Sequence, residues 1–385
     1  MTDRTDADLA VQHEACPCRR RARRGETRPA PVTARPSMAV AADLIAVIVA
    51  VTDDQPRVLT LAGTALPAGP FASEHRSLQS GLRSWVERQT HHPLGYVEQL
   101  YTFADRDRGP SEQEQRVISV SYLGLTRELG TLPDVPDPAA AGDGPPDGTA
   151  AGIATIVQQG VQPGVQPGSA RARVVPAGAS WCGWYDYFPW EDRRDGAGER
   201  VVAAVLPRLA AWAAQEGGER RRDRERRAAI SFGAAGARSW NEELVLQRYE
   251  LLHEAGLVEE AGDHGTPATS AAPLPGRRMV HDHRRILATG IARLRAKIKY
   301  RPVVFELMPP EFTLLQLQRA VEALAGRLLH KPNFRRLIAQ QALVEETGAM
   351  TTGTGGRPAK LFRFRREVLL ERAAAGTKLP LARAL

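Results

Sequence analysis

The amino-acid sequence predicts an α+β protein in which an α/β/α sandwich is followed by a C-terminal helical unit that ends in a β-hairpin. Three observations support this fold class. Strand and helix patterns alternate between residues 38 and 128, Pro and Gly concentrate between residues 130 and 180, and two helix patterns precede two short apolar runs within residues 312–364. A chain of 385 residues is long enough for more than one domain.

The sandwich is predicted from the order of elements after Met38. Apolar runs at 42–51 and 57–62 are separated by the turn sequence Asp-Asp-Gln-Pro, which predicts two neighbouring strands. A helix is expected from His75 to Thr90, because Leu, Trp and Val side chains recur on one side of it. Strands are expected next over Tyr96–Phe103 and Arg116–Leu125. Strands on both sides of one helix are typical of an α/β sandwich.

The middle of the chain interrupts this pattern. Residues 130–180 hold the near-repeat GVQPGVQPG and too few large apolar residues for a core, so they are interpreted as a linker or surface insertion. Residues 181–276 are interpreted as an aromatic and helical insertion. Its dense aromatic cluster either forms a ligand-stacking platform or packs in a core, and the core is the commoner outcome. Helices are predicted over 200–228, 241–261 and 281–300.

The C-terminal unit begins with a helix that Thr313 is expected to cap, and Gly326 is expected to end it. A second helix is predicted over Lys331–Gln341. Its apolar side is assigned to Phe334, Leu337 and Ile338, and its other side to Lys331, Asn333, Arg335 and Arg336. Two short strands follow, joined by a Gly-rich loop that ends in Arg357 and Lys360.

A helix, a turn, a basic helix and a hairpin with a basic tip are the layout of a winged helix-turn-helix, in which the second helix enters the major groove of DNA. An ordinary helical hairpin with a solvated charged face is the alternative. The charge distribution favours DNA binding. From Val280 onward the chain carries twenty Lys and Arg against eight Asp and Glu, a net charge of +12, whereas the whole chain is +8. A polyanionic partner is therefore expected at the C-terminal end only.

Individual contacts follow from side-chain chemistry. Asn333 and Arg336 are three residues apart, so they share a helix face, and both side chains suit bidentate contacts to base edges. Arg335 is the alternative to Arg336, because the start of the helix is uncertain by a residue or two. Lys331, Arg357 and Lys360 are better placed for phosphates, and Thr313 completes the predicted DNA-binding set.

Composition narrows the remaining possibilities. No apolar run is long enough to span a bilayer, and residues 1–37 lack the apolar segment of a secretory signal peptide. Three cysteines give no disulfide framework, so a cytoplasmic location is predicted. Residues 1–37 and 367–385 are predicted tails, the first of them disordered. No catalytic residue, metal ligand or cofactor is predicted.

One segment resembles the Nudix box, G-x5-E-x7-R-E-U-x-E-E-x-G-U, in register from Gly69. Arg83 matches the arginine of the box, Trp85 its apolar position and Glu87 the first carboxylate of the E-E pair. Other positions depart from the box. His75 stands at the first glutamate, and Ser84 replaces the glutamate after the arginine. Arg88 replaces the second glutamate of the pair, and Thr90 replaces the late glycine. Because Mg²⁺ needs clustered oxygen ligands, this pattern predicts the loss of hydrolysis.

Three C-terminal segments, KPNFRRLI, GGRPAKLFRF and ARLRAKIKYRP, together with VEQLYTFADRDRG, resemble the Nudix-related transcriptional regulators of NAD metabolism, the NrtR family. This resemblance implies a Nudix-like sensor domain over 38–300 and a winged-helix domain over 301–366. It implies a repressor that binds double-stranded operator DNA as a homodimer and responds to an NAD-related nucleotide such as ADP-ribose. The residues expected to bind this nucleotide are Gly69, Arg83, Glu87, Tyr101 and Phe103.

Two alternatives to this regulator remain. One is an active Nudix-type pyrophosphohydrolase with a nucleic-acid-binding appendage, in which Glu74 and Glu98 would substitute for the missing carboxylates. The other is an architectural or RNA-binding protein that uses its basic end without sensing a ligand. Metal-dependent hydrolysis of ADP-ribose would identify the first, and salt-dependent, sequence-specific duplex binding separates the regulator from the second.

Overall fold

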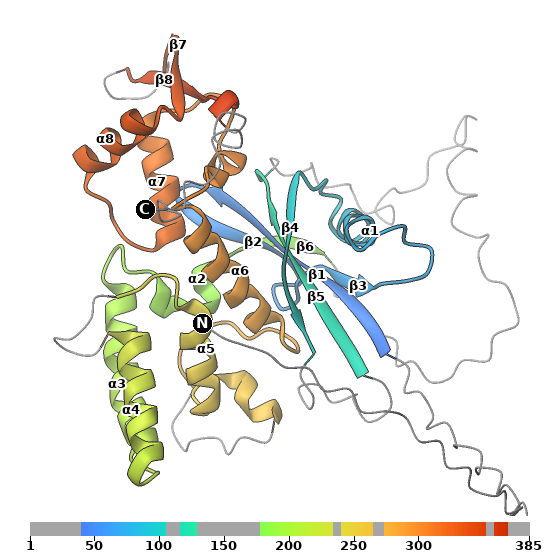
Figure 1. Ribbon diagram of the computed structural model, residues 1–385, viewed down its shortest axis with the longest axis vertical. Helices are drawn as coiled ribbons and strands as arrows, with labels where there is room; N and C mark the ends of the chain where they lie inside the picture. The colour runs from blue at the N-terminus through green and yellow to red at the C-terminus, as the bar shows by residue number, and fades with distance from the viewer. Residues whose placement is uncertain are drawn as a thin grey trace, which may run out of the picture. The chain divides into compact units, whose positions relative to one another are not determined.

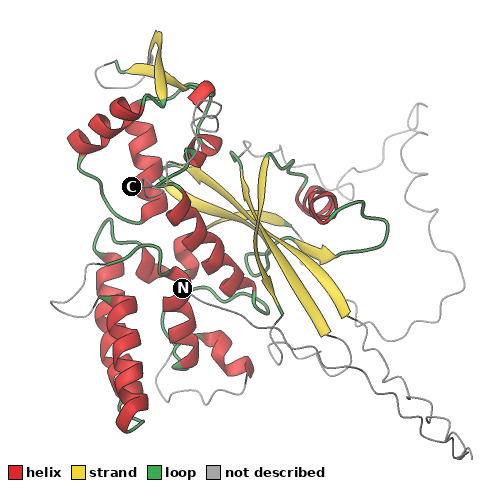
Figure 2. Cartoon of the chain, in the orientation of Figure 1, coloured by secondary structure: helices red, strands yellow, loops and turns green. Residues whose placement is uncertain are grey.

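The computed structural model describes residues 40–104, 116–128, 178–233, 240–264, 273–351 and 358–368 (Figures 1 and 2). The predicted N-terminal tail, residues 130–177 of the predicted linker and residues 369–385 lie outside this part of the chain.

The sandwich is built on a mixed sheet whose main strand order is β4-β5-β1-β2-β6, with β3 paired to β1. The strands are β1 (Val40–Thr52), β2 (Gln55–Leu61), β3 (Ala68–Pro70), β4 (Tyr96–Phe103), β5 (Arg116–Leu125) and β6 (Ala179–Gly183). β1 and β5 run parallel, and the other pairs run antiparallel. The four strands predicted from the sequence are confirmed. β6 comes from the end of the expected linker and extends the sheet by pairing with β2.

Both faces of this sheet are covered, as alternation along β1 requires. Leu44, Ala46 and Ile48 pack with side chains of α1 (Leu78–Thr90) in one cluster. The intervening Ile45, Val47 and Val49 belong to the large cluster on the opposite side. Successive side chains of a strand point to opposite faces, so β1 contributes to two cores. The predicted α/β/α sandwich is confirmed (Figure 1).

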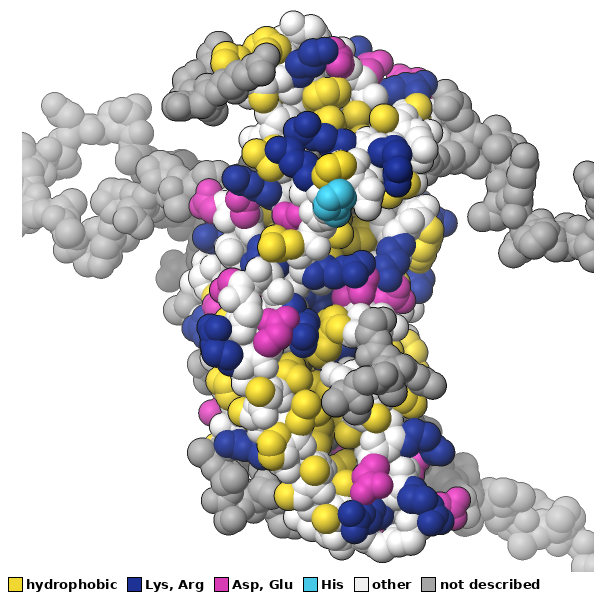
Figure 3. Space-filling view, turned by 90° about the vertical axis from the view of Figure 1, so that its left-hand side faces the viewer, with side chains coloured by type: hydrophobic (Ala, Val, Ile, Leu, Met, Phe, Trp, Pro, Cys, Tyr) yellow, Lys and Arg dark blue, Asp and Glu magenta, His cyan; other side chains and the backbone are white. Residues whose placement is uncertain are grey.

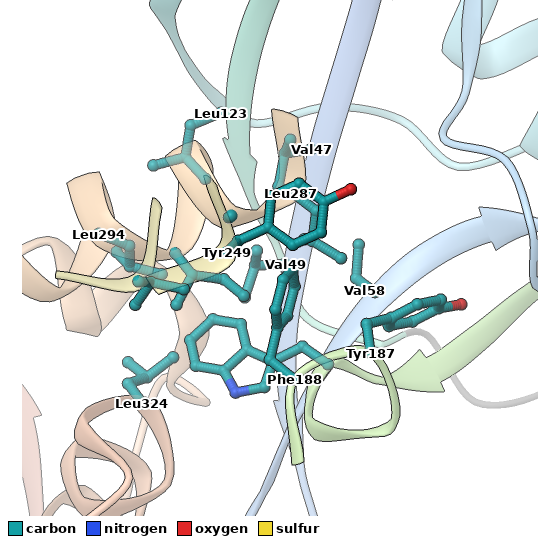
Figure 4. Close-up of a cluster of buried hydrophobic side chains, with 14 of the residues drawn as sticks. Val47, Val49, Val58, Leu123, Tyr187, Phe188, Tyr249, Leu287, Leu294 and Leu324 are labelled. Atoms are coloured by element: carbon teal, nitrogen blue, oxygen red, sulfur yellow. The ribbon is translucent and has the colours of Figure 1, made fainter. Parts of the chain in front are cut away.

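Helices that follow β6 in the chain form the layer opposite α1. They are α2 (Trp184–Tyr187), η2 (Pro189–Glu191), α3 (Ala197–Ala213), α4 (Gly218–Phe232), α5 (Val245–Glu254), η3 (Glu259–His264) and α6 (His283–Lys297). Figure 4 shows Tyr187 and Phe188 beside Val49, Val58 and Leu287. The buried residues of the aromatic cluster are Trp184, Tyr187, Phe188 and Trp190. These side chains form core, as the commoner of the two interpretations predicted.

Several helix boundaries in this layer differ from the predicted ones. The single helix expected over 200–228 is two helices, because the helical conformation is interrupted before the adjacent glycines Gly217 and Gly218. Gly218 has φ of 58°. The helix expected over 241–261 is shorter than predicted, because α5 ends at Glu254 and a separate 3-10 helix, η3, begins at Glu259. Glycine tolerates this positive φ without strain, which explains the break between α3 and α4.

The C-terminal unit contains η4 (Val303–Leu307), α7 (Leu314–Ala325), α8 (Lys331–Gln341), β7 (Val344–Met350) and β8 (Lys360–Phe364). Thr313 caps α7 by accepting a hydrogen bond from the Gln316 backbone N–H, as predicted. Gly326 ends α7 with φ of 70°. The two helices and the antiparallel hairpin confirm the predicted winged helix-turn-helix. Among the described residues, no helix has both the length and the apolar character needed to cross a lipid bilayer.

Candidate functional site

The second helix of the winged unit, α8, is held by two side chains one turn apart. Phe334 and Ile338 are each 8 % exposed and belong to the main apolar cluster. Pro332 in the first turn suits the start of the helix, where a backbone N–H has no partner within the helix. Leu337 was predicted to share this buried side, and that assignment is wrong: its side chain is 50 % exposed. The reason is geometric, because at about 100° per residue Leu337 lies about 80° from the direction midway between Phe334 and Ile338, at the edge of the buried side.

The rest of α8 faces solvent. Lys331, Asn333, Arg335 and Arg336 are all exposed, as predicted from the sequence. A guanidinium nitrogen of Arg336 donates to the Asn333 side-chain oxygen over 3.3 Å, so these two side chains lie on one face. Arg335 follows a different side of the helix, since neighbouring residues are about 100° apart. No residue of α8 is acidic, so its surface suits an anionic partner.

The wing lies beside this helix in the chain and carries paired charges. The Lys360 ammonium donates to both carboxylate oxygens of Glu346 over 2.8 and 2.9 Å. Arg363 pairs in the same way with Glu345. Two of the three N–H donors of this exposed ammonium group are thus engaged by a carboxylate, which competes with a phosphate for Lys360. Arg357 lies outside the described residues, and Thr313 is largely buried as the cap of α7.

The wing is fastened to the segment before α7. Phe312 and Phe362 exchange two backbone hydrogen bonds of 2.9 and 2.8 Å. The rings of Phe305 and Phe364 stack with their centroids 4.2 Å apart. These contacts fix the hairpin relative to the helices of the same unit, which is what a DNA-contacting wing requires.

Gly69, Arg83 and Glu87, three of the predicted nucleotide ligands, lie around α1. A Cβ at Gly69 would meet the ring of Trp85, so only glycine permits this ring to lie against β3. Arg83 donates to the carbonyl oxygens of Leu94 and Gly95, which ties α1 to the following loop. Gly69 and Arg83 therefore have structural roles here. Glu87 is exposed on an open hollow, whose lining residues are Ser80, Arg83, Ser84, Glu87, Arg88 and His91.

The side chains of this hollow do not fit the divalent cation of a Nudix hydrolase. Glu87 is its single carboxylate, and the Arg88 guanidinium lies 4.5 Å from the centroid of the Trp85 ring and donates to the Ser84 hydroxyl. Mg²⁺ is held by clustered oxygen ligands, and nearby guanidinium groups oppose its charge. Within the described ranges, no group of three or more His, Cys, Asp and Glu side chains is arranged to hold a metal ion.

Tyr101 and Phe103, the other two predicted nucleotide ligands, lie on β4, which β5 separates from β1. Their ring centroids are 5.1 Å apart. Tyr101 is 60 % exposed and accessible, whereas Phe103 is buried under the Arg285 guanidinium at 5.0 Å. The five predicted ligands thus form two groups, one around α1 and one on β4.

β4 is also bound to α6, the helix that leads into the winged unit. The Lys297 ammonium pairs with Glu98 and donates to the Tyr96 hydroxyl over 2.8 Å. The Tyr96 hydroxyl in turn donates to Glu98 over 2.7 Å. Burial lowers the pKa of Lys297 and raises the pKa of Tyr96. Glu98 is therefore engaged in a structural ion pair.

A buried ionic network that was not predicted from the sequence holds the end of α7. Glu191 accepts hydrogen bonds from Arg248 over 2.5 and 2.8 Å and from Arg295 over 2.6 Å. Arg295 also donates to the Leu324 carbonyl oxygen, and the Tyr185 hydroxyl donates to that of Ala323. The last carbonyl groups of a helix have no partner within it, so these donors complete the C-terminus of α7. No local sequence signal marks this network.

Comparison with known proteins identifies the winged unit. Residues 304–364 match the NrtR DNA-binding winged helix domain family. The C-terminal unit is therefore an NrtR winged helix domain. This finding confirms the resemblance that KPNFRRLI and GGRPAKLFRF indicated in the sequence.

Three known proteins are similar to this chain to different extents. The "ADPR responsive transcriptional repressor NtrR" of Acinetobacter baylyi is 41 % identical over 86 residues, which are 22 % of this chain and 34 % of the relative. The chain thus matches about a third of that relative's length. Shewanella oneidensis NrtR complexed with a 27mer DNA has 18 % identity and a TM-score of 0.45 over 85 % of this chain and 94 % of that one. A MutT/nudix family protein from Enterococcus faecalis has 15 % identity and a TM-score of 0.44 over 84 % and 86 %.

Proposed function

We propose that this protein is a DNA-binding transcriptional repressor whose sandwich domain senses an NAD-related nucleotide. The observation that carries the proposal is the NrtR winged helix domain, whose second helix presents an exposed surface free of acidic residues. Arg and Lys side chains neutralise phosphates, and Asn and Arg read base edges. The protein therefore recognises an operator through α8 and holds it through its basic residues.

DNA binding is tested by selecting duplexes from a random pool and measuring their affinity at several salt concentrations. A repressor of this kind enriches a defined sequence and binds it far more tightly than random duplex. Its affinity falls as salt rises, because phosphate contacts release counterions. Failure to enrich any sequence would remove the proposal and leave the architectural or RNA-binding alternative.

ADP-ribose is the proposed effector, since the Acinetobacter relative is named for its response to ADPR. The accessible ring of Tyr101 and the hollow on α1 are the candidate contact surfaces for a nucleotide. A ligand that binds the folded state alone raises the melting temperature. A thermal-shift series with ADP-ribose, NAD and AMP tests this, and no shift with ADP-ribose at millimolar concentration would exclude it as the effector.

The sandwich domain is proposed to bind without hydrolysing. The support is the set of side chains on α1, where Ser84 and Arg88 stand at two carboxylate positions of the Nudix box. Without clustered carboxylates, no metal ion is positioned to neutralise the diphosphate or activate water. The protein is further proposed to act as a homodimer, because a winged helix supplies one recognition helix and two-fold symmetry supplies the second half-site.

A further inference from the structure

Leu337 is an exposed leucine on the helix proposed to enter the major groove. Its side chain is 50 % exposed, whereas Phe334 and Ile338 on the same helix are each 8 % exposed. Every residue of α8 is described, and Leu337 is its one large apolar side chain among the exposed ones. Scattered surface leucines are common, so the position of this one on the helix decides whether it has a role.

That position places Leu337 among the residues proposed to read bases. Asn333 is four residues before it, Arg336 is adjacent and Gln340 is three residues after it, and all three are exposed. Residues at spacings of three and four lie on one helix face, so Asn333, Leu337 and Gln340 share one strip along α8, and Arg336, about 100° from Leu337, lies on the far side of Asn333. At about 1.5 Å rise per residue, Asn333 and Leu337 are about 6 Å apart along the axis, which is roughly two base steps.

The surroundings of this strip suit DNA better than another protein surface. α8 carries Lys331, Arg335 and Arg336 and no carboxylate. The face on the left of Figure 1, where α8 lies, is turned to the viewer in Figure 3; Lys and Arg side chains lie near its upper end beside hydrophobic atoms. Positive charge around an apolar side chain is complementary to a groove bordered by phosphates.

We propose that Leu337 is a specificity-determining residue that contacts the 5-methyl group of a thymine in the operator. Its branched side chain has no hydrogen-bond donor or acceptor, so it cannot read the polar edges of the bases. Thymine offers an apolar methyl group in the major groove, and apolar side chains recognise it there. The inference rests on the proposed function, to which it adds the base that α8 selects beside the contacts of Asn333 and Arg336.

The experiment removes the methyl group from the DNA and the side chain from the protein. Duplexes selected by the full-length protein from a random pool are resynthesised with deoxyuridine at each thymine in turn. For the wild type, one position per half-site should weaken binding by about fourfold, the value of one buried methyl group. Leu337→Ala should bind the thymine duplex about fourfold more weakly than the wild type does, and should bind thymine and uracil equally at that position.

A matched control is Leu328→Ala, since Leu328 is 67 % exposed and lies in the turn before α8. This variant should keep the preference for thymine over uracil. Because Leu337 is exposed, its replacement by alanine should leave the melting temperature within a degree or two of the wild type, which separates a lost contact from a damaged fold.

Two outcomes would overturn the inference. If the wild type enriches a defined sequence but binds thymine and uracil equally at every position, α8 reads DNA without Leu337, and the proposed function stands. If Leu337→Ala changes the oligomeric state in light scattering, the side chain belongs to a contact between copies of the chain. Failure to enrich any duplex would instead contradict the proposed function itself, so the selection step distinguishes failure of the proposed function from failure of the Leu337 contact.

Discussion

Replacing Glu191 by glutamine should destabilise the protein more than any surface exchange of the same kind. Glu191 is 1 % exposed, and the Arg248 and Arg295 side chains that bind it are fully buried. Glutamine keeps the shape and one acceptor oxygen but removes the negative charge. Two buried guanidinium groups would then lack a counterion, which is far less favourable than an intact buried pair.

The magnitude follows from this geometry. Breaking a buried ion pair by removing one partner costs about 3–5 kcal/mol, and Glu191 serves two arginines, so the upper part of that range is expected. Folded domains are stable by about 5–15 kcal/mol, so the variant should retain only part of its stability. Glu225→Gln is the matched control, because it breaks an exposed pair with Arg221, and such pairs contribute about 0–1 kcal/mol.

Urea unfolding followed by tryptophan fluorescence measures both variants against the wild type, since Trp184 and Trp190 lie in the core beside this network. An equal, small loss for Glu191→Gln and Glu225→Gln would refute the reasoning, because the two arginines would then have found other partners. A stable Glu191→Asp variant would not refute the reasoning, since aspartate keeps the negative charge.

The dependence of stability on pH provides a second measurement. Burial alone would raise the pKa of Glu191, but Arg248 and Arg295 outweigh it and hold the pKa below its usual value of 4.5. A carboxyl with a lowered pKa stabilises the fold fully above the unfolded value and loses that contribution as pH falls below it. Wild-type stability should therefore decline below about pH 4.5 more steeply than that of Glu191→Gln. Equal slopes would contradict this assignment.

Four further predictions concern function. Incubation with Mg²⁺ or Mn²⁺ and ADP-ribose should release no AMP above buffer, and robust metal-dependent turnover would restore the hydrolase alternative. Light scattering at micromolar concentration should show a dimer, and a monomer that stays monomeric on its selected duplex would rule out two-fold binding. Arg336→Ala should lose about 1–3 kcal/mol of base discrimination. Lys360→Ala should weaken selected and random duplexes alike and lower the salt slope by about one; unchanged discrimination in Arg336→Ala would place Arg335 in the groove.

Local signals in the sequence predicted the winged helix well. Thr313 begins α7 and Gly326 ends it, as expected, and α8 spans the predicted Lys331–Gln341. Caps and turn glycines act within a few residues, so a single sequence contains them. Leu337 was harder to predict: it is three residues after Phe334, a spacing typical of core, but its side chain lies at the edge of the buried side and is 50 % exposed.

Long-range contacts could not be predicted in the same way. Glu191 meets Arg248 and Arg295 across 57 and 104 residues of chain. β6 joins the sheet 120 residues after its partner Thr60. Hydrophobic periodicity describes one element at a time and does not contain the partner. The same limit applies to the residues predicted to bind the nucleotide. Phe103 lies in a segment that resembles the family, but the sequence does not show that Arg285 of α6 covers its ring.

α6 connects the candidate nucleotide surface to the winged unit by direct contacts. Near its start, Arg285 lies over Phe103 of β4, and at its end Arg295 donates to the Leu324 carbonyl oxygen of α7. These residues are about 15 Å apart on one continuous helix. A nucleotide alters DNA affinity only to the extent that it binds two arrangements of the protein with different affinity. α6 contacts both β4 and α7, and α7 precedes α8, so these contacts form the route that the proposed response to a nucleotide would use.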